Sequence, residues 1–80
     1  MFAIFSMTPL RLRLGRAIRR LRTAVGYSQE AFAYKAGVHR TTMSEIERGI
    51  SNISVDIAER MASALDIKLS RLFIEAEKEK

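Results

Sequence analysis

The sequence of 80 residues contains no cysteine and only one histidine, His39. Without cysteine the chain has no disulfide, no thiol nucleophile and no cysteine-ligated zinc site. A single histidine does not hold a metal unless several carboxylates converge on it. The sequence also lacks a nucleophile–histidine–carboxylate set and a glycine-rich phosphate-binding loop. These absences predict a protein that is not an enzyme and that needs no metal or other cofactor.

Long hydrophobic runs are also missing. The longest apolar stretch, residues 1–7, is far shorter than the roughly 20 residues that cross a bilayer. The arginine-rich segment that follows it is atypical of a signal peptide. We therefore expect a soluble cytoplasmic protein with no membrane partner.

The chain is long enough for only one small domain, which we place at residues 9–80. Residues 1–8 are expected to form an N-terminal arm, which is either disordered or uses Phe2, Ile4 and Phe5 to cover an apolar patch or a dimer seam. Because no effector domain is present, we expect no small-molecule effector. A domain of this size often needs a partner subunit or tight helical packing for stability, and this favours a homodimer.

Acidic residues are scarce in the first half of the sequence. Residues 1–44 hold eight Lys or Arg against Glu30 alone, a net charge of +7, whereas residues 45–80 hold six against eight acids, a net charge of −2. This asymmetry predicts one face that meets a polyanion. The alternative is a basic helix surface that is simply solvated.

Proline and glycine are few, and their positions divide the chain into helices. No segment alternates polar and apolar residues over a useful length, whereas apolar residues recur at helical spacing. The sequence therefore predicts a compact all-α bundle of five short helices. We expect Thr8, Ser28, Ser54 and Ser70 to act as N-caps, Pro9 to occupy the first helical position, and Gly26, Gly37 and Gly49 to end helices. The inward-facing stripes are expected to include Leu10 and Val25 in the first helix and Val55 in the fourth.

The most informative segment is SQEAFAYKAGVHRTTMSEIERG, residues 28–49. Two short helices are separated by Ala36-Gly37-Val38, which is the helix-turn-helix arrangement whose second helix enters the major groove of DNA. Met43 and Ile46 hold that second helix against the core. We therefore expect its exposed side to contact DNA bases through Arg40, Thr41, Thr42, Ser44 and Glu45.

From about Leu10 to Phe73 the sequence resembles the lambda-repressor-like (Cro/C1-type, XRE) helix-turn-helix family. The matching segments are LRTAVGYSQEAFA, AGVHRTTMSEIERG, NISVDIAERMASALDI and LSRLF. Within this family, RTTMSEIERGISNIS is most similar to the controller proteins of restriction–modification systems. The resemblance implies a lambda-repressor-like DNA-binding domain with the helix-turn-helix at its second and third helices.

The resemblance and the residue types together suggest roles for individual side chains. The resemblance implies that Gln29 binds a DNA phosphate, although a solvated glutamine is the alternative. Arg40 can form a bidentate contact with guanine, or instead contact a phosphate or remain free. Glu45 can accept a hydrogen bond from cytosine or pair with Arg40 or Arg48, and His39 is expected to cap its helix.

Further phosphate contacts are expected from Arg16, Ser51, Asn52 and Ser54. Arg13, Arg19, Arg20 and Lys35 are additional candidates, some of which must face away from any one duplex. The resemblance also implies a structural ion pair between Arg22 and Glu47, which would fix the docking angle of the third helix. The dimer interface is expected on the fifth helix, at Leu69, Leu72, Phe73, Ile74 and Ala76.

The predicted function is a sequence-specific transcriptional regulator that binds double-stranded DNA. One module touches few bases, so we expect a homodimer on a pseudo-palindromic operator, with half-sites about 34–36 Å apart. A restriction–modification controller and a small phage- or plasmid-type repressor both fit this description. The alternative is an antitoxin or bridging module of the same fold, whose main partner is another protein.

Overall fold

The computed structural model describes residues 8–80 and shows five α-helices, so the predicted fold class is confirmed. They are α1 (Leu10–Ala24), α2 (Gln29–Ala36), α3 (Arg40–Arg48), α4 (Val55–Ala64) and α5 (Leu69–Lys78). The expected N-terminal arm lies almost entirely outside the described residues. None of the helices in residues 8–80 is long and apolar enough to cross a membrane.

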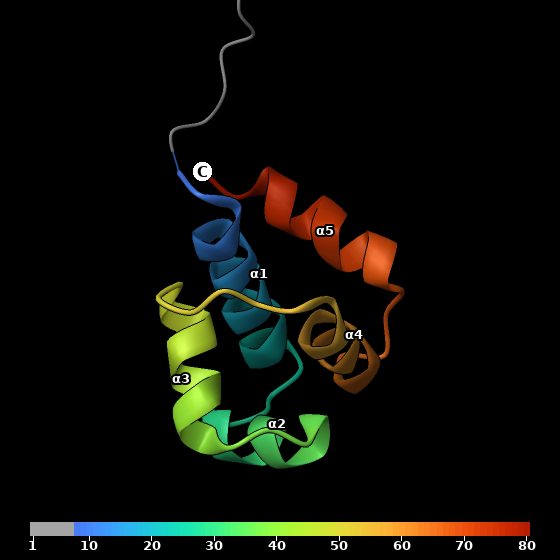
Figure 1. The fold of residues 1–80 in the computed structure, drawn as a ribbon. Coiled ribbons are helices and arrows are strands. Elements are labelled where there is room, and N and C mark those ends of the chain that lie inside the picture. Colours follow the sequence, from blue (N-terminus) through green and yellow to red (C-terminus); the bar gives the residue numbers. More distant parts are fainter. Residues whose placement is uncertain (1–7) are drawn as a thin grey trace, which may run out of the picture.

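The long helix α1 lies in the centre of the molecule, between α3 and α5 (Figure 1). Its contacts are most extensive with α5 on one side and with α3 on the other. Helix α2 packs against α3 and α4. The largest side chains that are fully buried between these helices are Ile18, Phe32, Met43, Ile46, Met61 and Leu72.

Several helix ends lie where their local sequence predicts. Ser28 Oγ accepts a hydrogen bond from the Ala31 N–H, and Ser54 Oγ accepts one from the Ile57 N–H, each at 3.1 Å. Gly37 and Gly49 end α2 and α3 in the left-handed conformation. These caps depend only on short-range chemistry, because the cap side chain lies within three residues of its backbone partner.

Two expected helix starts are wrong. Helix α5 begins at Leu69 with Lys68 as its N-cap, so Ser70 lies inside the first turn instead of capping it. Leu69 packs against the core, and this contact explains why the helix begins before the serine. Pro9 occupies the N-cap of α1 and not the first helical position, so Thr8 is not the N-cap.

The apolar stripes are also narrower than expected. Val55, at the first position of α4, is 74% exposed, and Leu10 and Val25 at the two ends of α1 are exposed as well. All three lie at helix termini. The apolar periodicity of the sequence includes them, but no neighbouring helix covers these ends. These three positions therefore lie outside the core.

Candidate nucleic-acid interface

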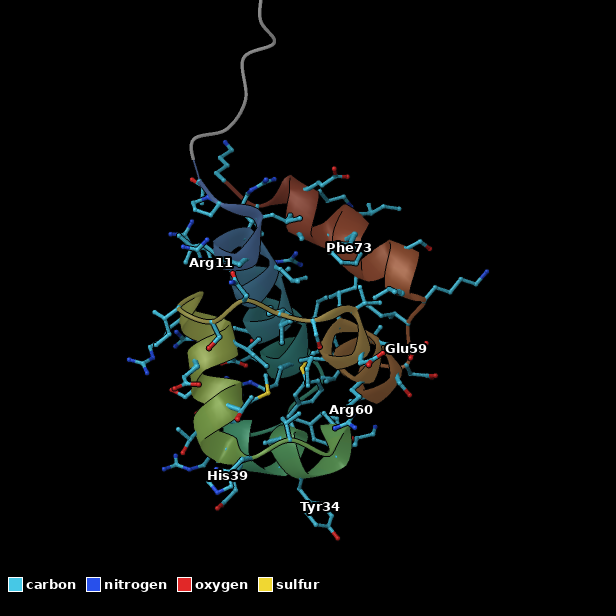
Figure 2. The ribbon with its side chains drawn as sticks, in the orientation of Figure 1. Arg11, Tyr34, His39, Glu59, Arg60 and Phe73 are labelled. Carbon is cyan, nitrogen blue, oxygen red and sulfur yellow. The ribbon has the colours of Figure 1, made fainter. Side chains whose placement is uncertain are left out.

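The α2–turn–α3 segment forms the helix-turn-helix. Gly37 follows α2 with φ 74°, a left-handed conformation that glycine adopts without steric penalty. His39 is the N-cap of α3, and its Nδ1 accepts a hydrogen bond from the Thr41 N–H at 3.2 Å. The expected capping role of His39 is therefore present. Figure 2 shows His39 at the end of α3 where that helix begins.

One side of α3 is buried and the other faces solvent. Met43 and Ile46 are in the core, whereas Arg40 and Thr41 are exposed at the N-terminal end of the helix. Thr42, Ser44 and Glu45 are partly exposed. We call these five residues, Arg40, Thr41, Thr42, Ser44 and Glu45, the outer face of α3. Glu45 accepts a hydrogen bond from Ser51 Oγ at 3.4 Å and pairs with neither Arg40 nor Arg48.

A buried ion pair joins α3 to α1. Arg22 Nε lies 2.6 Å from Glu47 Oε2, and Arg22 Nη2 donates to Glu47 Oε1 at 3.0 Å, so the pair is bidentate. Only 9% of the arginine side chain and 3% of the carboxylate side chain are exposed. Arg22 Nη1 also donates to the Tyr27 carbonyl oxygen at 2.8 Å. The pair therefore ties α3 both to α1 and to the segment that leads into α2.

Gln29 takes part in the same network. Its Nε2 donates to Glu47 Oε1 at 3.1 Å, and its side chain is half-buried. The side chain is therefore not a freely solvated glutamine. The first turn of α2 also carries backbone N–H groups without helical partners, which suit an anion. Gln29 is placed at that turn, next to the ion pair that positions α3.

Two glycines allow the backbones of α1 and α3 to approach closely. A Cβ atom on Gly15 would lie 2.2 Å from the Ile46 carbonyl oxygen, and one on Gly49 would lie 2.7 Å from Leu12 Cα. Gly15 is unfavourable for a helix interior by about 1 kcal/mol relative to alanine. The close approach explains its presence, since no side chain fits between the two helices there.

Sequence reasoning missed a contact at the other end of α3. Arg11 Nε donates to the Gly49 carbonyl oxygen at 3.1 Å. Figure 2 shows Arg11 on α1 close to the C-terminal end of α3. The periodicity of α1 does not identify this residue, because the pairing depends on how α1 crosses α3. Ser51, Asn52 and Ser54 follow this end of α3, and the side chain of Ser54 is occupied as the α4 cap.

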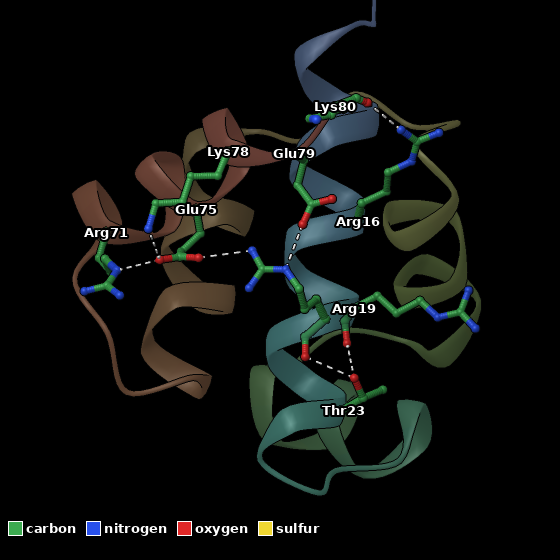
Figure 3. Close-up of polar contacts among 9 residues, drawn as sticks. Arg16, Arg19, Thr23, Arg71, Glu75, Lys78, Glu79 and Lys80 are labelled. Atoms are coloured by element: carbon green, nitrogen blue, oxygen red, sulfur yellow. Dashed lines mark hydrogen bonds and ion pairs between the residues drawn. The ribbon is translucent and has the colours of Figure 1, made fainter.

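Arg16 was expected to contact phosphate, but it lies elsewhere. Its Nη1 donates to the Lys80 carbonyl oxygen at 2.8 Å, at the end of the chain beyond α5 (Figure 3). Helices α5 and α3 pack against different sides of α1, so Arg16 faces away from α3. A phosphate contact from Arg16 stays a prediction. The sequence does not reveal its contact with Lys80, because helical spacing alone does not tell which neighbour each arginine of α1 faces.

The next arginine on that side, Arg20, is neutralised by α5. It pairs with Glu79 at 2.8 Å and with Glu75 at 3.1 Å, the two acidic residues labelled in Figure 3. Glu75 also accepts from Arg71 at 2.8 Å and from Lys78 at 3.3 Å. These cations, Arg71 first, lower the pKa of Glu75 to about 2. The carboxylate of Glu79, followed by that of Glu75, raises the pKa of Arg20.

The residues expected at a dimer interface divide into two groups. Leu72 and Ala76 are completely buried in the core of the subunit, so they are not available to a second copy in this conformation. Leu69 and Phe73 are partly buried, and Ile74 is 48% exposed. Leu72 and Ala76 therefore do not fit an interface in this conformation. The remaining three residues, Leu69, Phe73 and Ile74, form what we call the outward side of α5, and an interface there stays a prediction.

Comparison with known proteins identifies the family. Residues 18–72 match the helix-turn-helix family. The chain is 38% identical over 74 residues to the control protein C.MunI from Mycoplasma sp, an alignment that covers 91% of this chain and all of that protein. The chain belongs to the XRE helix-turn-helix family of DNA-binding transcriptional regulators.

Solved structures of this family agree with the fold. The restriction–modification controller protein C.AhdI from Aeromonas hydrophila has a TM-score of 0.74 at 39% identity, over 76% of this chain and 92% of that one. SinR, the master regulator for biofilm formation, was solved in complex with DNA; it has a TM-score of 0.69 at 35% identity, over 74% of this chain and 95% of that one. The family consists of regulators and not of enzymes. Within residues 8–80, no three His, Asp or Glu side chains converge in a way that could hold a metal ion.

Proposed function

We propose that this protein is a sequence-specific transcriptional regulator that acts as a homodimer on a pseudo-palindromic operator, as a controller of a restriction–modification system. The observation that carries the proposal is the outer face of α3: Arg40 and Thr41 are exposed at the start of a helix whose opposite side is fixed to the core. Similarity to C.MunI and C.AhdI, both controller proteins by name, supports the regulatory role.

The chemistry of the outer face of α3 suits base recognition. A guanidinium reaches the O6 and N7 atoms of guanine in a bidentate contact, and threonine can meet a thymine methyl group. Arg40 forms no ion pair or hydrogen bond with the rest of residues 8–80, so its donors are available to DNA. Glu45 is oriented by Ser51 and is the candidate acceptor for a cytosine amine.

The framework behind α3 supports a fixed docking angle. The Arg22–Glu47 pair and the close contacts at Gly15 and Gly49 hold the C-terminal end of the helix against α1. A recognition helix that is held in this way does not need to be ordered when it binds. Base contacts are therefore made at low entropic cost.

The proposal is tested by selecting bound duplexes from a random pool with the full chain. We expect an inverted repeat whose half-site centres lie about 34–36 Å apart. Arg40→Ala should relax the preference at one base position of each half-site. The free energy that discriminates the right base from a wrong one there should fall by about 1–3 kcal/mol. Lys68→Ala, which removes one exposed charge next to α5, is the control and should select the same sequence.

Two results would contradict this function. If no duplex is enriched, DNA is not the specific partner, and the alternative of a protein-binding antitoxin or bridging module is favoured. If Arg40→Ala and Lys68→Ala have equal effects on the selected sequence, the outer face of α3 does not read the bases.

A further inference from the structure

Arg11 of α1 contacts the residue that ends α3. We propose that Arg11 forms a phosphate-binding site at the C-terminal end of α3, with one phosphate of the DNA backbone as its ligand. The inference rests on the proposed function, because it concerns the same DNA-bound state. It adds a contact from α1, the helix behind the helix-turn-helix.

The hydrogen bond of Arg11 orients its guanidinium without using up its donors. Nε donates to the Gly49 carbonyl oxygen at 3.1 Å, and the Nη1 and Nη2 groups make no hydrogen bond or ion pair with the rest of residues 8–80. Arginine presents its donors in a rigid planar fork that matches phosphate geometry. Fixing one edge of this plane through Nε leaves the other donors exposed and pre-oriented for an anion.

The charge of Arg11 is also not neutralised. Arg20 is paired with Glu75 and Glu79, and Arg22 is paired with Glu47. Within residues 8–80, Arg11 has no acidic partner within 4.0 Å, and the residue is exposed. A full positive charge is therefore presented beside the end of α3, where Arg48, the last residue of the helix, is also exposed.

The position of Arg11 complements the contacts at the other end of α3. A helix of nine residues is about 13 Å long, close to the roughly 12 Å width of the major groove. When its first residues reach the bases, its last turn lies toward the phosphate backbone. Gln29, in the first turn of α2, donates to Glu47 in this last turn of α3. Arg11, which is joined to the residue that ends α3, therefore lies at the same end of the helix as Gln29.

A purely structural role for Arg11 would be to cap α3. In that role Arg11 Nε only satisfies the Gly49 carbonyl oxygen, which lies near the negative end of the α3 dipole. Glutamine separates the two roles, because its Nε2 follows Cδ as Nε does in arginine. Arg11→Gln therefore keeps a donor that can reach the Gly49 carbonyl oxygen and removes both Nη groups and the charge.

The experiment measures DNA affinity of the full chain as a function of salt, with the selected duplex and with unrelated duplexes. For a phosphate contact, Arg11→Gln should weaken binding to all sequences alike and reduce the slope of log K against log salt concentration by about 1 per subunit. The thermal unfolding midpoint should stay near that of the wild-type protein. Lys68→Gln, the matched control, should leave the slope unchanged.

The inference is overturned if Arg11→Gln keeps the wild-type slope and affinity, or if Lys68→Gln lowers the slope equally. Should Arg11→Gln unfold, the side-chain resonances of wild-type Arg11 decide the question by NMR. Protection of its Nη protons from solvent exchange on DNA binding supports the phosphate contact, and unchanged exchange contradicts it. Failure of the proposed function is distinguishable, because the wild-type protein would then select no duplex sequence.

Discussion

Glu47 is the side chain on which the position of α3 depends most directly. It accepts hydrogen bonds from Arg22 of α1 and Gln29 of α2, so one carboxylate joins three helices. A buried ion pair is not strongly stabilising compared with an apolar pair, because both ions lose their hydration. Its value here is geometric, since a bidentate pair fixes both the distance and the direction of its partners.

Replacing this carboxylate by an amide should be strongly destabilising. Glu47→Gln leaves the charge of Arg22 buried and unpaired, and we expect a loss of about 3–5 kcal/mol in the free energy of unfolding. Glu45→Gln, two residues earlier on the partly exposed side of α3, should change it by no more than about 0.5 kcal/mol. Urea denaturation at neutral pH compares the two variants, and equal losses would show that Glu47 has no special structural role.

At the scale of elements, the decisive feature is the crossing of α1 and α3. Gly15 lies so close to the Ile46 carbonyl oxygen that a methyl group would overlap it. Cores resist added volume at such contacts, because the surrounding backbone must move. The crossing therefore sets how far α3 projects from the domain.

Whether Gly15→Ala raises or lowers the stability of the fold tests this crossing. By helix propensity alone, Gly15→Ala would stabilise α1 by about 1 kcal/mol. The clash with α3 should reverse this effect, and we expect a net loss of about 1–3 kcal/mol, together with weaker DNA binding. Thermal unfolding of the variant measures the sign directly, and a higher midpoint than that of the wild-type protein would contradict the crossing.

The sequence predicts where the helices lie better than it predicts which side chains contact one another between helices. The number of helices, the turn at Gly37 and the caps at Ser28 and Ser54 follow from short-range chemistry. The start of α5 does not, because packing of Leu69 outweighs the capping tendency of Ser70. The partners of the arginines on α1 also depend on the crossing of helices. The contacts of Arg16 with Lys80 and of Arg11 with Gly49 therefore do not follow from the sequence.

At the scale of the whole molecule, α1 connects two surfaces with different tasks. Arg11 and Arg22 contact α3 and the segment before α2, whereas Arg16 and Arg20 contact the α5 end of the chain. Glu75 is the centre of the second set, with Arg20 from α1 and Arg71 and Lys78 from α5. Any partner bound to α5 is thereby held in a fixed relation to α3.

The Glu75 network predicts how stability depends on pH. The pKa of Glu75 is lowered from 4.5 to about 2 by Arg71, Arg20 and Lys78. A lowered pKa in the folded state means that the contribution is complete above about 4.5 and is lost as the pH falls toward 2. Wild-type protein should therefore be more stable than Glu75→Gln at pH 7, and the difference should shrink between pH 4.5 and pH 2. A difference that stays constant in urea denaturation across this range would contradict the ion-pair network.

The outward side of α5 is the predicted dimer interface, and Ile74 is its most exposed apolar residue. We expect the wild-type protein to sediment as a dimer at micromolar concentrations and Ile74→Asp to sediment as a monomer with its helical circular dichroism retained. Tyr34→Asp is the control, since Tyr34 is 89% exposed on α2 and lies outside α5. A wild-type monomer, or a dimer that survives Ile74→Asp, would place the interface elsewhere or remove it.

Dimerisation should also determine affinity for the operator. Two linked modules on two half-sites gain about 10²–10⁴ in affinity over one module, without any new contact. Ile74→Asp should therefore bind the inverted repeat no more tightly than a single half-site, although the outer face of α3 is unchanged. If the monomeric variant still prefers the full repeat, the two half-sites are joined by contacts that α5 does not provide.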